Sequence, residues 1–90
     1  MNTGDIVTSL NGRDKDRRFI IIETDNEYSL ISNGKNRRLE KPKRKKNKHL
    51  KLESKADNFI VEKIYDKKLT NNEIRKHLAV TKGEMPDAKR

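Results

Sequence analysis

Four bulky apolar residues, Phe19 to Ile22, follow one another in a chain that is otherwise poor in such residues. Hydrophobic residues make up 30% of the 90-residue sequence, whereas 41% of its residues are charged. Such a composition lies close to that of disordered proteins, so a folded domain must gather its apolar residues in a few places. Since Phe and Ile favour strands, this run predicts the most buried strand of a small domain.

Shorter strand patterns lie on both sides of that run. Residues 5–10 (DIVTSL) alternate between glycine-containing turns, and residues 28–32 (YSLIS) alternate after a polar turn. Asn33-Gly34 is a strong hairpin signal because both residues accept positive φ. It predicts a return strand over residues 35–40 with Leu39 pointing inward.

A fifth strand is predicted at HLKL, residues 49–52, where Leu50 and Leu52 share a face. Pro42 cannot donate to a strand ladder, so it marks the end of a strand. Five short strands with brief turns predict a mainly β fold over residues 1–53. A small barrel is the expected form, because closure removes open sheet edges.

The segment from residue 54 to residue 80 predicts one or two short helices. A first helix is expected to begin near Asp57, and a second to span 71–79. Thr70 and Glu73 have the spacing of a capping box, and Leu69 and Ile74 that of a hydrophobic staple. Residues 81–90 are charged and contain Gly and Pro, which predicts a flexible tail.

The net charge of +9 is concentrated in one part of the chain. Between Lys35 and Lys51, ten lysines and arginines accompany a single acidic residue, Glu40, and the rest of the chain carries equal numbers of acids and bases. A concentrated positive field of this kind attracts phosphate polymers, and also acidic proteins or anionic membranes.

Several classes of function are disfavoured. Without cysteine, the chain has no disulfide, thiolate zinc site or cysteine nucleophile, and His49 and His77 alone argue against a transition-metal site. We find no set of residues arranged for catalysis, so we expect a non-enzymatic monomer without cofactor, metal or small-molecule substrate. No apolar run approaches a membrane span, which takes about 18 residues or more, and no signal peptide is evident. We therefore expect a cytoplasmic protein that does not bind membranes.

Three clusters of cations are the candidate binding residues. They are Arg13, Lys15, Arg17 and Arg18 in the first strand connection, Lys35, Arg37 and Arg38 after the Asn-Gly turn, and Lys41, Lys43, Arg44, Lys45, Lys46 and Lys48 in an expected loop. Phosphates require several cations at different angles, and Arg adds bidentate geometry. Solvated charges are the alternative, with Asp14 and Asp16 partly neutralising the first cluster. PKRKK, residues 42–46, also matches a nuclear-localisation pattern, but the strands predicted on either side disfavour a free, extended signal.

The few aromatic residues bear on the mode of recognition. Phe19, Tyr28, Phe59 and Tyr65 all occupy positions that we assign to core faces, with an outward-facing ring as the alternative for Tyr28, which begins a strand. Readers of single-stranded RNA stack bases on exposed aromatic rings. With no such platform, recognition is expected to depend on phosphate and on RNA shape rather than on base identity.

The sequence GDIVTSLNGRDKDRRFIII, residues 4–22, resembles a KOW-type domain. Together with LISNGKNRRLEKPKRKKNKHL and LTNNEIRKHL, it is similar to small bacterial KOW-domain RNA-binding proteins related to eukaryotic-type large-subunit ribosomal proteins. The resemblance implies an SH3-like barrel followed by short helices, and structured RNA, ribosomal RNA first, as the partner. Asp16 stands where the family pattern has glycine, a residue that allows positive φ and close approach of the backbone.

A protein-interaction module of the transcription or translation machinery is the alternative function. An exposed apolar patch formed by Ile60, Ile64, Ile74 and Leu78 would favour it. The same residues docked against the β domain would count against it.

Overall fold

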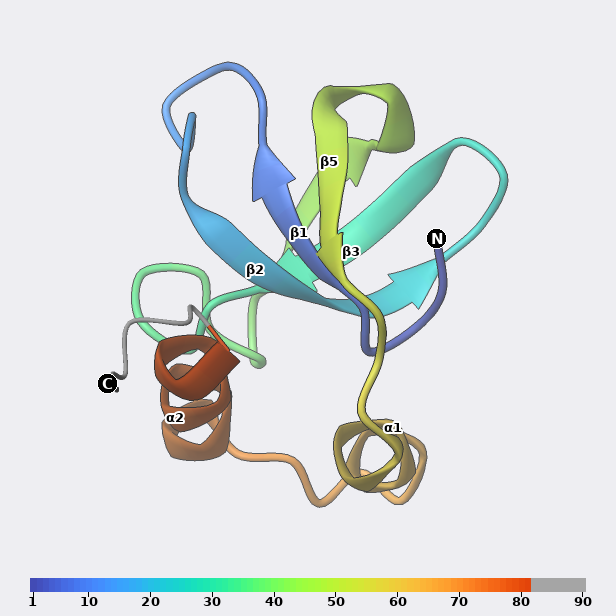
Figure 1. The fold of residues 1–90 in the computed structure, drawn as a ribbon, viewed down its shortest axis with the longest axis vertical. Helices are drawn as coiled ribbons and strands as arrows, with labels where there is room; N and C mark the ends of the chain where they lie inside the picture. The colour runs from blue at the N-terminus through green and yellow to red at the C-terminus, as the bar shows by residue number, and fades with distance from the viewer. Residues whose placement is uncertain (82–90) are drawn as a thin grey trace, which may run out of the picture.

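Five strands precede two helices in the computed structural model, which describes residues 1–81 (Figure 1). The strands are β1 (Ile6–Ser9), β2 (Arg18–Thr24), β3 (Tyr28–Ser32), β4 (Lys43–Lys46) and β5 (Leu50–Ser54), with a 3₁₀ turn at Asn47–His49 before β5. The helices are α1 (Asn58–Tyr65) and α2 (Asn71–Thr81). Apart from Thr81, which ends α2, the predicted tail lies outside the described residues.

All strand pairs are antiparallel, and the order across the sheet is β4-β3-β2-β1-β5. Within residues 1–81, no ladder joins β4 to β5, so these strands form two open edges. The prediction of a five-stranded β fold followed by helices is therefore confirmed at this level, and the sheet is not closed.

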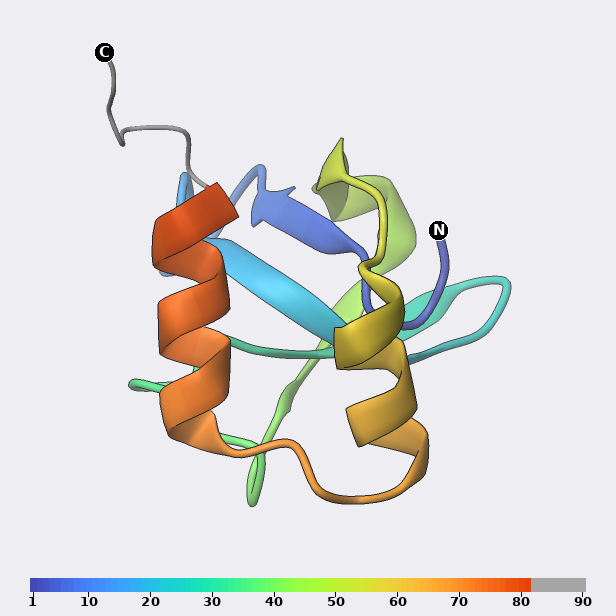
Figure 2. The same cartoon turned by 60° about the horizontal axis from the view of Figure 1, so that its bottom comes forward.

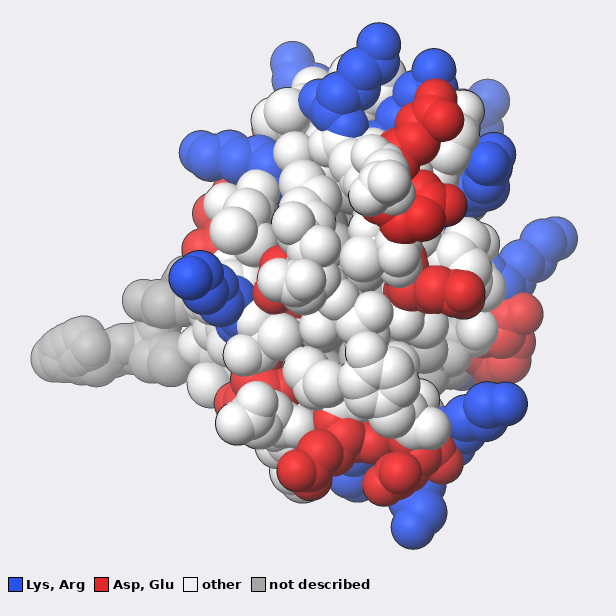
Figure 3. All heavy atoms as spheres, turned by 90° about the vertical axis from the view of Figure 1, so that its right-hand side faces the viewer, with Lys and Arg blue, Asp and Glu red and all other residues white. Residues whose placement is uncertain are grey.

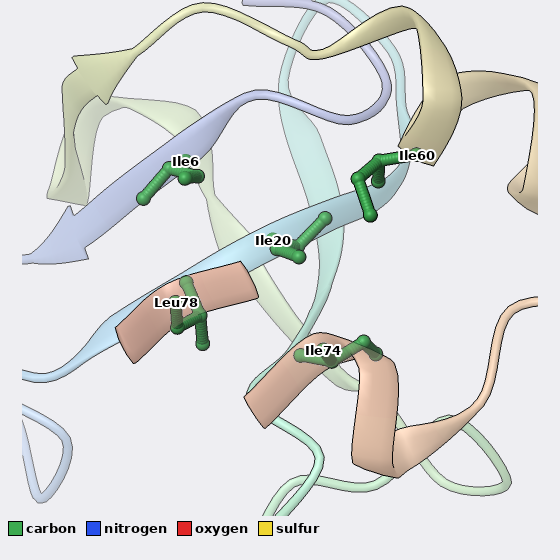
Figure 4. Packing of buried hydrophobic residues seen from close by; sticks show 5 residues of the cluster. All are labelled: Ile6, Ile20, Ile60, Ile74 and Leu78. Carbon is green, nitrogen blue, oxygen red and sulfur yellow. The ribbon is translucent and has the colours of Figure 1, made fainter. Parts of the chain in front are cut away.

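The apolar run in β2 is buried on both faces of the sheet. Phe19 and Ile21 belong to one core cluster, completed by Val7, Ile31 and Leu50. Ile20 belongs to the other, with Ile6, Ile60, Ile74 and Leu78, and Ile22 packs against it (Figure 4). Successive side chains of a strand point to opposite faces, so one strand supplies both clusters. The prediction that this is the most buried strand is confirmed, because Phe19, Ile20 and Ile21 have no exposed surface.

Both helices lie on the same side of the sheet, next to each other (Figure 2). They insert Ile60, Ile74 and Leu78 into the second cluster, against Ile6 and Ile20 of the sheet. The apolar surface that would have favoured a protein-interaction module is thus largely docked within the chain.

The return strand after Asn33-Gly34 was predicted wrongly. Residues 33–42 form a loop, and the strand that pairs with β3 is β4, Lys43–Lys46. The loop folds back on itself because the Asn33 side-chain oxygen accepts the backbone N–H groups of Lys35 and Arg37, both at 2.9 Å. The Leu39 backbone N–H donates to the Asn71 side chain at 2.8 Å instead of to a neighbouring strand.

Gly34 fixes this loop against the start of α2. Its φ is +72°, and a Cβ there would lie 2.3 Å from the backbone oxygen of Asn71. The Arg75 guanidinium also donates to the Gly34 carbonyl. The Asn-Gly pair therefore begins a loop that packs on a helix, and the hairpin turn that the sequence predicts does not form there.

Side-chain caps define where both helices begin. The Asp57 carboxylate accepts the Phe59 backbone N–H at 2.9 Å, which places the N-cap of α1 where the sequence predicts it. At α2, the Glu73 carboxylate accepts the Thr70 N–H at 3.0 Å and the Thr70 hydroxyl accepts the Glu73 N–H at 3.1 Å. The predicted capping box is confirmed.

Helix α1 ends in a Schellman motif whose left-handed residue is Lys67, with φ of 57°. The Lys67 and Lys68 N–H groups donate to the carbonyls of Ile64 and Lys63, at 3.1 and 2.8 Å. Glycine is the residue that this position favours.

Replacing Lys67 by Gly is therefore expected to raise the free energy of unfolding by about 0.5–1 kcal/mol, since it removes left-handed strain. The measurement is urea denaturation. Lys68→Gly is the matched control, because Lys68 does not have positive φ, and it should not stabilise the protein. Equal effects of the two substitutions would contradict this account.

Candidate nucleic-acid interface

Three of the candidate cations hold the fold together. The Arg18 guanidinium donates to the Leu78 carbonyl at 2.7 Å, at the C-terminal end of α2. The Lys45 amine donates to the Asn11 carbonyl at 2.8 Å, which ties β4 to the loop between β1 and β2. Arg37 pairs with Asp14. All three side chains therefore have structural partners, and the partner of Arg37 is an acid.

The Arg37–Asp14 pair joins the β1–β2 loop to the β3–β4 loop. The Arg37 Nε and Nη2 atoms donate to one carboxylate oxygen of Asp14, at 3.2 and 3.1 Å. The Asp14 side chain is 4% exposed and that of Arg37 is 29% exposed. A partly buried, charge-assisted contact of this kind fixes the relative position of the two loops.

The lysine-rich stretch that was expected to be a loop is largely an edge strand. In β4, Lys43 and Lys45 pair with Ile31 and Ser29. Directly paired residues lie on the same face of a sheet, so these two lysines share the face of the buried Ile31 and Ser29. Lys43 and Lys45 are half-buried, as expected if their apolar stems cover that core, and the Lys45 amine ends on the Asn11 carbonyl.

Arg44 and Lys46 occupy the opposite face of β4. The Arg44 guanidinium lies 3.6 Å from the centre of the Tyr28 ring, and the Lys46 amine 5.9 Å from it. Arg44 thus stacks on an aromatic ring while remaining exposed.

Most of the other candidate cations have no acidic partner among the described residues. Arg38 lies 3.9 Å from Glu40 in an exposed ion pair, and such pairs contribute little to the free energy of unfolding. No ion pair to another residue of 1–81 is found for the remaining candidates, which are Arg13, Lys15, Arg17, Lys35, Lys41, Lys43, Lys46 and Lys48. Their positive charge is available to an external anion.

Several of these cations gather along two adjoining open grooves. The first, of about 630 Å³, includes Arg17, Lys35 and Asn36 and runs beside the C-terminal half of α2. The second, also about 630 Å³, includes Asn36, Arg38, Lys41 and Lys43. Since Asn36 lines both, the two grooves meet. We call them together the basic groove.

The acidic residues are distributed differently from the basic ones. On the face drawn in Figure 3, acidic side chains lie among uncharged ones, and Lys and Arg stand mainly along the edges. Near the basic groove, the Glu40 carboxylate accepts the Asn71 side-chain N–H at 2.8 Å, and this hydrogen bond lowers the pKa of Glu40. The acid within the basic window is therefore held by α2.

Asp16 has a left-handed backbone, with φ of 69°. Its N–H donates to the Ser9 carbonyl at 2.8 Å, and the Ser9 N–H donates to the Arg17 carbonyl at 3.0 Å. The turn therefore requires positive φ at the position where the KOW pattern has glycine. Asp16 also lines the basic groove, so its carboxylate adds negative charge there.

The assignment of all aromatic residues to core faces was wrong. Phe19 is buried, but Phe59 and Tyr65 on α1 are 58% and 71% exposed. Tyr28 is half-buried under Arg44. The contact between Tyr28 and Arg44 depends on the β3–β4 register, in which Tyr28 pairs with Lys46 and Leu30 with Arg44. The sequence alone does not give that register.

The chain matches no protein-family model, and no curated protein is significantly similar to it. Within residues 1–81, no helix is long and apolar enough to cross a membrane. Nor does this part of the chain contain a cluster of three or more side chains suited to a metal ion.

We expect Arg37→Gln to lower the free energy of unfolding by about 1–3 kcal/mol, because it leaves the buried Asp14 carboxylate without its charged partner. Lys35→Gln, which removes an unpaired cation from the same loop, should change it by less than about 0.5 kcal/mol. Urea denaturation of both variants measures the difference. Similar changes in the free energy of unfolding for the two variants would show that the Arg37–Asp14 pair does not stabilise the fold.

Asp16 offers a separate test of backbone strain. Asp16→Gly is expected to raise the free energy of unfolding by about 0.5–1 kcal/mol, and Asp16→Ala to lower it by about 1 kcal/mol, because only glycine adopts positive φ freely. Asp16→Asn is the control for charge, since Asn tolerates the left-handed region as Asp does. Thermal or urea unfolding distinguishes the three, and a stable Asp16→Ala variant would refute the assignment.

Proposed function

We propose that this protein is a non-enzymatic, cytosolic RNA-binding protein that contacts the phosphate backbone of structured RNA through the basic groove. Its main support is the gathering of cations from separate loops, Arg17 on one side and Lys35, Arg38 and Lys41 on the other, of which only Arg38 has an ion pair with a described acidic residue. Phosphates along an RNA backbone require cations at several positions and angles. Ribosomal RNA is the target that the KOW resemblance suggests.

The strand arrangement supports the finer fold assignment that belongs to this proposal, a KOW-type SH3-like barrel. Four strands meander from β1 to β4, and β5 returns to pair with β1 after a single 3₁₀ turn. The Lys45 amine on the β4 edge donates to the Asn11 carbonyl in the β1–β2 loop, so this edge also contacts the far side of the sheet through a side chain. The positive φ at Asp16 agrees with the glycine of the KOW pattern.

The salt dependence of RNA binding tests this proposal. The triple substitution of Lys35, Arg38 and Lys41 by Gln is expected to weaken binding to a structured RNA. It should also reduce the magnitude of the log-log salt slope by about 2 to 3, since each neutralised phosphate contributes about 0.7–0.9. The three residues are exposed, and the fold should survive their replacement.

The matched control removes the same charge elsewhere. Lys55, Lys68 and Lys76 are exposed and line neither part of the basic groove. Their replacement by Gln should leave the salt slope nearly unchanged. If both triple variants alter the slope equally, RNA responds to net charge alone and the basic groove is not the binding surface.

A further inference from the structure

A smaller hollow lies beside the basic groove and differs from it in chemistry. It has a volume of about 340 Å³ and is lined by Glu23, Tyr28, Leu30 and Arg44, together with Thr24 and Asp25. Arg44 also lines the second part of the basic groove, so the two sites adjoin at this side chain. Among the described residues that line this hollow, Arg44 is the only cation, whereas two are acids whose carboxylates would repel a phosphate.

The register of the sheet places the lining residues in rows. Glu23 pairs with Leu30, and Leu30 with Arg44, so these side chains cross β2, β3 and β4 on one face. Tyr28 and Lys46 form the next row. A planar guanidinium on an aromatic ring therefore stands next to an apolar side chain and a carboxylate.

The two carboxylates that line the hollow differ in their contacts. The Asp25 carboxylate accepts the backbone N–H groups of Tyr28 and Glu27, both at 2.7 Å, and these bonds lower the pKa of Asp25. Asp25 thus holds the turn that positions Tyr28. The Glu23 carboxylate, by contrast, makes no hydrogen bond or ion pair with another described residue and is exposed.

Resting on the proposed RNA-binding function, we propose that this hollow binds one unpaired RNA base, preferably guanine, stacked on the Arg44 guanidinium. The guanidinium lies on the Tyr28 ring with one face, and unpaired bases stack on arginine planes as they do on aromatic rings. Glu23 accepts hydrogen bonds from the base edge. Guanine presents two adjacent donors, N1–H and the N2 amino group, to a single carboxylate, whereas the other bases present one donor group beside acceptors.

The neighbouring cations fit this arrangement. Lys46, whose amine lies 5.9 Å from the Tyr28 ring centre, can meet the phosphate of the bound nucleotide. Lys41 and Lys43 line the part of the basic groove next to Arg44 and would hold the phosphates that follow. The protein would then bind phosphates of paired RNA in the groove and one unpaired base beside it.

The probe is a short uridine RNA that carries one central guanosine, compared with the all-uridine RNA and with a blunt-ended RNA duplex. We expect the native protein to bind the guanosine-containing RNA on the order of tenfold more tightly than all-uridine RNA. Arg44→Lys keeps the charge and loses the plane, and Glu23→Gln loses the carboxylate, so both should abolish that preference. Arg38→Lys, an equivalent change in the basic groove, should retain it.

A second measurement reports on the ring itself. Tyr65→Phe leaves Tyr28 as the only tyrosine in a chain without tryptophan, so its fluorescence should change on binding guanosine-containing RNA and not on binding the duplex. Salt-dependent RNA binding with no preference for guanosine, or with the preference intact in Arg44→Lys, overturns the base site but leaves the proposed function standing. Absence of salt-dependent RNA binding overturns both.

Discussion

Burial of β2 on both faces is the constraint on which the rest of the structure depends. Phe19 and Ile21 enter one core, and Ile20 enters the other, where the helices dock. Apolar residues are scarce, and these two clusters contain all the buried hydrophobic residues of the part of the chain that the structure describes, so little remains to build other buried elements. Charged residues are consequently left to the edges and loops of the sheet. The basic groove follows from this distribution, since it is lined mainly by loop residues at the edge of the sheet.

The elements that the sequence predicts well are those with local signals. The run at Phe19, the alternation at Tyr28–Ser32 and the capping box at Thr70 each contain their cause within a few residues, and the structure contains each of them. The return strand failed because Asn33 turns the loop back on itself and because the Leu39 N–H donates to the distant Asn71 of α2, which the local pattern does not reveal. Nor could periodicity reveal β4, whose four residues are all basic. Its strand conformation comes from the ladder with β3, and only the tertiary fold provides that partner.

The basic residues of β4 also have a structural role. It is an open edge of the sheet, and lysines on an edge discourage pairing with other chains. Edge protection alone, however, explains charge only within β4. Arg17, Lys35, Arg38 and Lys41 lie outside that strand and still meet along the basic groove. The sequence therefore predicts that positive charge is concentrated here, but not which cations form a surface. Strand register decides which lysines of β4 are half-buried and which arginine stacks on Tyr28.

Asp14 shows why a local reading of charge misleads in such a chain. In sequence it sits among Arg13, Lys15 and Arg17, where it would neutralise its neighbours. In the structure its carboxylate is buried against Arg37 from the other loop, and those neighbours have no ion pair with a described residue. The acid thus fixes the two loops that border the basic groove, and it leaves the adjacent cations unpaired. Asp14 therefore supports the positive surface. The cation that it neutralises is Arg37 from the other loop, and the cations next to it in the sequence keep their charge.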